Sequence, residues 1–332
     1  MQKTFALGAL FAAAALAPAP YSPAAAEEIR IAVGCPPVPA CSDWLWAEDL
    51  AGRLNAGGLE AKVYTGGALG KDPEIVDQLA QGLLQFGLVN FVMIKEVDPT
   101  VLGFLAPYMF DDMAHFFRAT LDAESALMDG VKASMAAQGV RIAGLPGIGG
   151  TMGIFNSKRP VTGPGDLAEL RLRAIDDSQI KLFEQWGAAG AVVDMPEFAG
   201  AVSQGVVDGY FNPPIVPVIF KHTDFLTHYT DLGAGTPFRS ALMSADWYDG
   251  LDDAARALVD EAVAAAMEGN RAWTLEAAKA EPAMLKERGV TVTELSPEAL
   301  ADFRARSEAV WPILMPEEKI AAFQALAEAT RK

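Results

Sequence analysis

The chain has 332 residues, of which 51% are hydrophobic and 21% are charged. This composition supports one large domain or two lobes with packed cores and argues against a disordered protein. Its 26 basic and 43 acidic residues give a formal net charge of −17, which argues against nucleic acid as a partner. A small anionic ligand stays compatible with that charge, because one buried arginine outweighs a distant, diffuse field.

The N-terminus has the pattern of an export signal. Lys3 is the only charged residue before Glu27, an apolar run covers residues 5–16, and alanines at 24–26 form a small-residue cleavage site. A membrane anchor is the alternative, but the apolar run is shorter than the ~20 residues that span a bilayer. We therefore expect residues 1–26 to be a cleaved signal peptide. No later segment is long and apolar enough to span a membrane, which predicts a soluble periplasmic protein.

The two cysteines, Cys35 and Cys41, follow the signal closely. In an oxidising periplasm this spacing predicts a short disulfide loop, and two buried free thiols remain the alternative. Neither cysteine has an obvious partner residue nearby in the sequence, so the pair does not indicate a zinc site.

The first half of the mature chain alternates strands with helices. Strands are predicted at 28–34, 61–64 and 86–91, and helices at 44–54 and 72–83. Ser42 or Asp43 is the candidate cap of the first helix. The third strand is nearly all apolar, as a buried parallel sheet requires. This alternation predicts an open α/β sheet.

The second half continues in the same style. Strands are predicted at 141–145, 153–156, 170–174, 191–193 and 206–211, and helices at 177–186, 196–203 and 297–309. Residues 252–288 are Ala-rich and uninterrupted, and a helix of this length reaches roughly 50 Å, enough to brace two lobes.

The glycine-rich stretch 147–153 invites a dinucleotide-binding reading, since Gly147 and Gly149 have the right spacing. Met152 occupies the position of the required third glycine. We expect instead a crossover between lobes that needs free backbone torsions.

Catalytic and metal-binding patterns are scarce. The chain has three histidines, His115, His222 and His228, and their spacing suits neither a helix nor a strand ligand pair. The sequence contains no HExxH, CxxC or GxSxG motif. We therefore expect no metal, no cofactor and no enzymatic activity, with all three histidines in surface or structural roles.

Five segments in fixed order carry a family resemblance. They are Gly66–Gly70 followed by Glu74 and Gln81-Gly82, Ala106–Asp112, Asn156–Val161, Asp166–Arg173, and Gly205–Pro213. From about Ile29 to Trp247 their spacing resembles that of DctP-type solute-binding proteins of tripartite ATP-independent periplasmic (TRAP) transporters. The last two segments at their observed separation are the most specific of the five.

This resemblance implies an α/β fold with two lobes, each an open mixed sheet flanked by helices, and a long helix that spans both. We expect the first lobe at residues 27–150 plus 238–275 and the second at 151–237 plus 276–332. Ligand is expected to close the lobes like a hinge. The implied function is capture of a small organic acid and its delivery to TRAP membrane permease subunits. A binding protein for an ABC importer or a sensor kinase is the alternative, and an enzyme on a similar scaffold is a more distant one.

The resemblance also implies the site. Arg173, at a strand end, is the expected clamp for a substrate carboxylate, because a guanidinium presents two parallel donors and keeps its charge. From the residues alone, a surface arginine on a strand end is the favoured interpretation of Arg173, whereas Asn212 fits a turn residue and a ligand contact equally. The further implied ligand contacts are Asn212, Asn90, Phe91, Met195 and Phe211. We add Trp44 as a wall residue, for which helix core is the alternative.

One position departs from the family pattern. Many members carry a second arginine four residues before the Asn of Asn-Ser-Lys, where this chain has Met152. The missing charge argues against a dicarboxylate held at two points. Together with the aromatic candidates, the adaptable, apolar Met152 favours a monocarboxylate with an aromatic or branched body, with sugar acids as the alternative.

Overall fold

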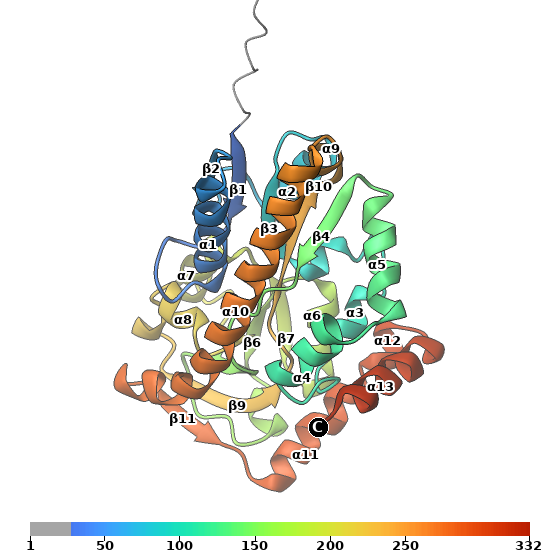
Figure 1. The fold of residues 1–332 in the computed structure, drawn as a ribbon. Coiled ribbons are helices and arrows are strands. Elements are labelled where there is room, and N and C mark those ends of the chain that lie inside the picture. The colour runs from blue at the N-terminus through green and yellow to red at the C-terminus, as the bar shows by residue number, and fades with distance from the viewer. Residues whose placement is uncertain (1–27) are drawn as a thin grey trace, which may run out of the picture.

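The computed structural model describes residues 28–332. The predicted signal peptide lies outside the described residues, and its cleavage stays a prediction. Two mixed sheets, each flanked by helices, form the two parts of the molecule (Figure 1). We call the part around the first sheet the first lobe and the part around the second sheet the second lobe.

The first sheet has five strands in the order β2-β1-β3-β10-β4. Its strands are β1 (Ile29–Val33), β2 (Ala61–Tyr64), β3 (Phe86–Asn90), β4 (Val140–Gly144) and β10 (Arg239–Ser244). The strands β2, β1 and β3 are parallel, and β10 is antiparallel to both β3 and β4. Four of the five residues of β3 are fully buried, which explains its apolar sequence.

The second sheet has six strands in the order β11-β9-β5-β8-β6-β7. Its strands are β5 (Met152–Asn156), β6 (Arg171–Ala174), β7 (Ala189–Val192), β8 (Gly209–Asn212), β9 (His228–Ala234) and β11 (Thr291–Glu294). Strand β6 is parallel to β7 and β8, whereas β5 is antiparallel to β8 and β9. The sequence pattern failed to show β9, β10 and β11, and it placed the start of β8 three residues too early.

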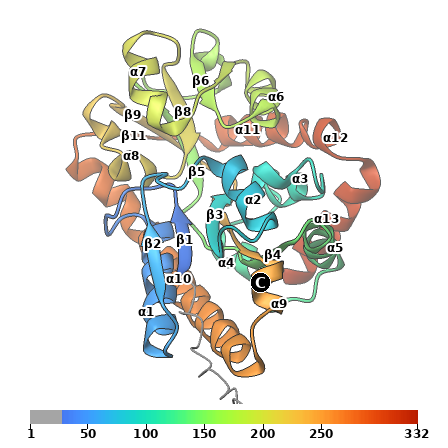
Figure 2. The ribbon, with the colours of Figure 1, turned by 90° about the horizontal axis from the view of Figure 1, so that it is seen from above.

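Helices cover both sheets. They are α1 (Ser42–Ala56), α2 (Asp72–Ala80), α3 (Val101–Phe104), α4 (Met113–Phe117), α5 (Ala126–Ala136), α6 (Asp177–Trp186), α7 (Phe198–Ser203), α8 (Val216–Ile219), α9 (Ala245–Asp249), α10 (Asp253–Glu287), α11 (Pro297–Glu308), α12 (Trp311–Leu314) and α13 (Glu317–Thr330). The C-terminal helices α11, α12 and α13 run along the side on which α3 and α5 lie (Figure 2).

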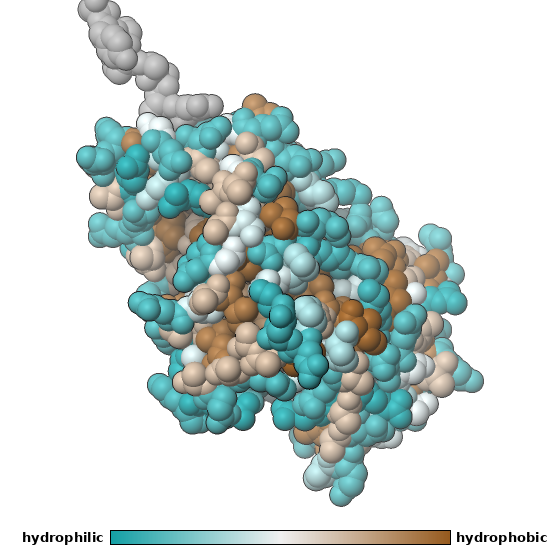
Figure 3. Space-filling view, turned by 90° about the vertical axis from the view of Figure 1, so that its right-hand side faces the viewer, coloured by the Kyte–Doolittle hydropathy of each residue, from teal (hydrophilic) through white to brown (hydrophobic). Residues whose placement is uncertain are grey.

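The predicted lobe boundaries remain predictions. They place α13 in the second lobe, yet this helix packs against α3, which follows the strands of the first sheet. Figure 3 shows the right-hand side of the molecule as drawn in Figure 1. On this face, patches of hydrophobic residues are separated by hydrophilic residues. Among residues 28–332, no helix combines the length and apolar character of a membrane span.

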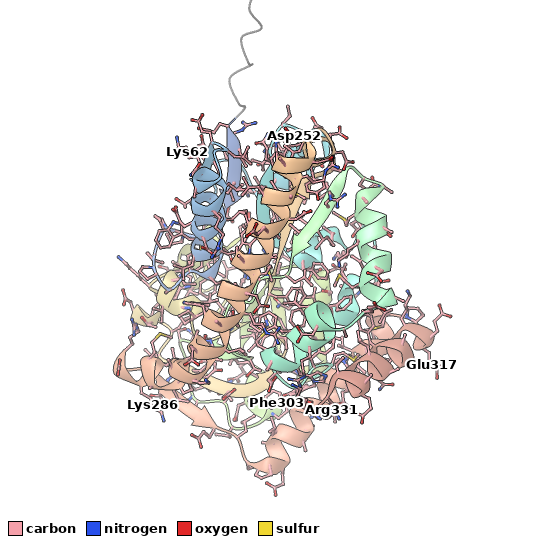
Figure 4. All side chains as sticks on the ribbon, in the orientation of Figure 1. Lys62, Asp252, Lys286, Phe303, Glu317 and Arg331 are labelled. Carbon is pink, nitrogen blue, oxygen red and sulfur yellow. A yellow bond between two sulfur atoms is a disulfide. The ribbon has the colours of Figure 1, made fainter. Side chains whose placement is uncertain are left out.

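Helix α10 is the long helix that the sequence predicts. Its first turn is capped by the Asp252 carboxylate, which accepts the Ala255 N–H at 2.8 Å. It packs against α1, α4 and β4 in the first lobe and against β11 in the second. Figure 4 shows Asp252 and Lys286 near its opposite ends, in the two halves of the molecule. The helix therefore braces both lobes.

The glycine-rich crossover lies where predicted, but the physical reason for its glycines is different. None of its glycines has a positive φ, so free torsions are not what they provide. They allow close packing on α10, since a Cβ on Gly149 would lie 2.3 Å from a Glu281 carboxylate oxygen. The Asn270 side chain exchanges two hydrogen bonds with Gly147, of 2.8 and 3.0 Å. The crossover is thus fixed to the long helix.

Candidate functional site

Two pairs of charged side chains join the facing edges of the lobes. Lys95, which follows β3, contacts Asp176, the N-cap of α6, at 2.5 Å, and it also pairs with Asp177. Lys71, before α2, contacts Asp194, after β7, at 2.5 Å. These loops follow the carboxyl ends of parallel strands, the usual place for ligands in open α/β sheets. The ligand site is therefore expected between these edges.

Arg173 lies on β6 in the second lobe and is only 6% exposed. Its Nε donates to the Val193 carbonyl at 2.7 Å, and within residues 28–332 it has no acidic partner. Burial, and after it the positive charge of Arg239, lower the pKa of Arg173 to about 10, so the guanidinium remains charged at neutral pH. The charges of Asp194 and Asp72 favour the ionised form, but within residues 28–332 neither pairs directly with Arg173. An incoming anion would therefore offset the cost of this buried cation.

Two side chains face the same guanidinium and stay neutral. Tyr210 on β8 pairs in register with Arg173, and its ring packs on His222. Burial and the charge of Arg173 lower the pKa of His222 to about 4, while burial raises the pKa of Tyr210. The surroundings of Arg173 on this side therefore provide no competing anion.

Asn212 is the last residue of β8, at the same edge of the sheet. Its side-chain amide nitrogen is buried, and it lacks a hydrogen-bond partner within the described part of the chain. A buried donor left unpaired costs about 1–3 kcal/mol. Asn212 and Arg173 together thus present unused donors at one end of the second sheet.

The first lobe contributes charged groups that the sequence did not reveal. Arg239, the first residue of β10, donates from Nε to Asp43 at 3.0 Å and also contacts the Asn90 side-chain oxygen. Asn90 in turn donates from its backbone and side-chain nitrogens to Asp72, at 2.9 and 2.6 Å. Burial opposes ionisation of Arg239, but Asp43 and Asp72 more than compensate and raise its pKa.

Asp43 therefore has a different role from the predicted helix cap. Helix α1 begins at Ser42 with Cys41 at the N-cap and without a side-chain capping bond, whereas the Asp43 carboxylate is almost completely buried against Arg239. Just before it, Cys35 and Cys41 are joined in a disulfide, as predicted. The sulfurs are therefore not free to bind metal, and the closed loop holds Asp43 in place.

The aromatic residues expected to contact ligand lie in the core. The Phe91 ring packs on Phe104 and Phe238, with the Phe238 centroid 5.0 Å away. Phe211 packs edge-on against Trp186 beneath α6, at 5.1 Å. Both phenylalanines are at most 2% exposed, compared with 6% for Arg173 and 9% for Asn212, so a ligand contact of these two rings stays a prediction.

The remaining predicted contacts are half-buried. Met195 begins the short turn after Asp194, and Met152 begins β5 beside Gly235. The Trp44 indole N–H donates to Glu48 one turn further along α1, at 3.0 Å. Trp44 also packs against a hydrophobic cluster that contains residues of both sheets, so its role as a wall residue stays a prediction.

Comparison with known proteins identifies the family to which the chain is similar. The family model described as bacterial extracellular solute-binding protein, family 7 (DctP), matches residues 44–318. The chain is 31% identical over 267 residues to the C4-dicarboxylate-binding periplasmic protein DctP of Rhodobacter capsulatus, covering 78% of each protein. It is 27% identical over 256 residues to the ectoine/5-hydroxyectoine-binding periplasmic protein UehA of Ruegeria pomeroyi, covering 74% of this chain and 73% of that one.

A solved structure shows the same fold. The sugar acid binding protein DctPAm of Advenella mimigardefordensis, in complex with galactonate, superposes with a TM-score of 0.84 at 20% identity. The match covers 92% of this chain and 98% of that one. The two-lobed architecture with its long helix is thus confirmed.

Proposed function

Because the chain belongs to the DctP family of bacterial extracellular solute-binding proteins, we propose that it captures a small organic acid for a TRAP-type transporter. The family consists of transport proteins that work with membrane permeases, and its members are periplasmic. We further propose that residues 1–26 direct export and are cleaved. The mature protein then binds its ligand in the periplasm.

The observation that carries the ligand proposal is the environment of Arg173. This guanidinium is buried, charged and without an acidic partner in the described chain, and the unpaired amide of Asn212 lies at the same sheet edge. A carboxylate accepts from both groups at once, which removes a buried unpaired charge and an unpaired donor together. We therefore propose that Arg173 and Asn212 hold the ligand carboxylate.

The relatives' ligands are compatible with such a clamp. C4-dicarboxylates, ectoine and galactonate, named for three similar proteins, differ in size and charge but each has a carboxylate group. We propose a monocarboxylate for this chain, because Met152 stands at the position of the second family arginine. An aromatic or branched body for this ligand stays a prediction, since Phe91 and Phe211 are buried.

Binding is coupled to closure through the charged edges of the lobes. A ligand that contacts both lobes binds the closed arrangement more tightly than an open one, so it shifts the population toward closure. The Lys95–Asp176 pair forms only when these edges meet, and both side chains are less than 20% exposed. The closed, loaded protein is the form that we propose docks on the permease.

A thermal-shift screen tests this function. The mature protein is unfolded, refolded to remove carried-over ligand, and heated with monocarboxylates, dicarboxylates, sugar acids and ectoine. A ligand well above its Kd raises the Tm because it binds only the folded state. We expect carboxylates to raise the Tm and their amides or alcohols to leave it unchanged. A Tm that no carboxylate changes would contradict the proposal.

A further inference from the structure

We propose that Arg239 is the first-lobe half of the ligand-binding site, and that Asp43 and Asp72 restrict the ligand to one carboxylate plus neutral hydrogen-bond donors such as hydroxyl groups. This inference rests on the proposed function and adds the class of ligand. None of these three residues is among those that the sequence pattern suggested as ligand contacts.

The position of Arg239 places it opposite Arg173. It begins β10 and pairs in register with Asn90, the last residue of β3, so it lies at the carboxyl edge of the parallel strands of the first sheet. Arg173 lies at the corresponding edge of the second sheet. Lys71, next to Asp72, pairs with Asp194, and the neighbouring Val193 carbonyl accepts from Arg173. These contacts bring the two edges together, and the charge of Arg239 lowers the pKa of Arg173.

Two like charges facing each other oppose closure unless an anion lies between them. Arg239 is held by Asp43 through Nε, and its side chain retains 22% exposure. Arg173 has no such acid. A carboxylate that accepts from both guanidinium groups converts their repulsion into attraction across the lobe boundary. Ligand binding would thereby favour the closed arrangement directly.

The charges around this position set the rest of the ligand. Two guanidinium groups, Arg173 and Arg239, lie near the carboxylates of Asp43, Asp72 and Asp194, of which Asp194 is paired with Lys71. Asp72 uses one oxygen for both Asn90 donors, and its other oxygen makes no hydrogen bond within residues 28–332. That oxygen is suited to a donor such as a hydroxyl group. A second ligand carboxylate there would meet like charge, whereas hydroxyl groups would be bound.

The test uses hydroxy acids in pairs that differ only by oxidation of the terminal hydroxymethyl group to a carboxylate: D-galactonate with galactarate, D-gluconate with D-glucarate, and glycerate with tartronate. Their Kd values are measured by calorimetry with the wild-type protein and with Arg239→Lys and Asp72→Asn. Arg53→Lys is the matched control, since Arg53 forms an exposed pair with Asp49 one turn away on α1.

We expect the monocarboxylate of a binding pair to bind at least about tenfold more tightly than its partner, because a buried like-charge contact is strongly unfavourable. Arg239→Lys should weaken it by about tenfold or more, because lysine retains the charge but cannot reach Asp43, Asn90 and the ligand at once. Asp72→Asn should reduce the ratio of the dicarboxylate Kd to the monocarboxylate Kd within a pair. A general structural defect would not change that ratio, and Arg53→Lys should match the wild type.

Other results would overturn the inference. If Arg239→Lys binds like the wild type while Arg173→Lys does not, Arg239 is not part of the site and the proposed function stands. Tighter binding of the dicarboxylates would contradict the role of Asp43 and Asp72. If none of the six acids binds but another carboxylate raises the Tm, the hydroxy-acid inference fails alone. If no carboxylate raises it, both proposals fail.

Discussion

Glu281 gives the protein a pH-dependent stability that a single substitution should remove. This residue of α10 is 2% exposed, and both of its carboxylate oxygens accept the Gly150 N–H of the crossover, at 3.1 and 3.2 Å. Burial raises its pKa from 4.5 to about 8, against the effect of the Gly150 hydrogen bond and with a smaller contribution from the charge of Asp231. It is therefore protonated in the folded protein at neutral pH.

The sign of the effect follows from proton binding. Between pH 4.5 and 8 the folded state holds a proton at Glu281 that the unfolded state releases. The free energy of unfolding therefore falls as the pH rises through this window. At about 1.4 kcal/mol per pKa unit, the shift corresponds to a loss on the order of 5 kcal/mol, a large part of the ~5–15 kcal/mol that stabilises a typical domain.

Glu281→Gln cannot ionise but keeps a carbonyl oxygen for the Gly150 N–H. We expect the variant and the wild type to have similar free energies of unfolding at pH 5 and the variant to be several kcal/mol more stable at pH 8.5, on the order of the linkage estimate. Glu281 lies beside a pocket with a volume of about 380 Å³. The other charged groups that line this pocket are Asp112, Asp231, Lys286 and Glu294.

Urea unfolding at a series of pH values measures the effect. Glu276→Gln is the control, since Glu276 lies on the same helix but is 74% exposed in its pair with Lys279. The control should follow the wild-type pH profile. Parallel profiles for Glu281→Gln and the wild type would refute the reasoning, because they would mean that Glu281 ionises with an ordinary pKa in the folded state.

Three further substitutions test the fold and its closure. Lys95→Met removes the interlobe contact with Asp176 and should raise the Kd of a bound carboxylate by about fivefold in calorimetry at low salt; an unchanged Kd would show that the pair does not stabilise closure. Replacing Cys35 and Cys41 together by serine should lower the free energy of unfolding in urea by about 2–3 kcal/mol, and an unaltered value would mean that the loop is constrained without the disulfide. Asp252→Ala should cost about 1 kcal/mol in the same assay through the lost cap of α10, and full stability would contradict the capping role.

The family resemblance assigned Arg173 and Asn212 to the ligand, and local patterns in the sequence predicted where they lie in the fold. Arg173 ends a run of alternating apolar and charged residues, and Asn212 precedes two prolines that stop a strand. Both were therefore placed at strand ends, where the structure has them. Helix α6 matched its predicted bounds because Asp176 caps it and Gly187 ends it in the left-handed region.

Arg239 was missed because its strand has no clear alternation. Residues 239–244 mix arginine and serine with apolar residues, and five of the six are buried, since β10 lies between β3 and β4. Asp43 was taken for a cap because the residues alone do not show a partner 196 positions away. Contacts of this range depend on the return of the chain from the second lobe, which adds β10 to the first sheet.

The alternation of side chains along β8 bears on the prediction for Phe211. Consecutive residues of a strand point to opposite faces of the sheet, so Phe211 and Asn212 extend from opposite faces of β8, and a ligand contact of Phe211 stays a prediction. In the structure Tyr210 packs on His222 on one face, and Phe211 packs on Trp186 on the other. The alternation of side-chain directions along a strand already predicts that Tyr210 and Phe211 point to opposite faces of the sheet.

The central claim is that the Arg173 guanidinium binds a ligand carboxylate. Calorimetry with the carboxylate that most raises the Tm of the refolded protein, comparing the wild type with Arg173→Lys and Arg173→Gln, tests it most directly. We predict that lysine weakens binding by at least about tenfold and glutamine by more, because a buried charge-assisted pair is lost, while both variants stay folded without ligand. Wild-type affinity in Arg173→Gln would contradict the claim.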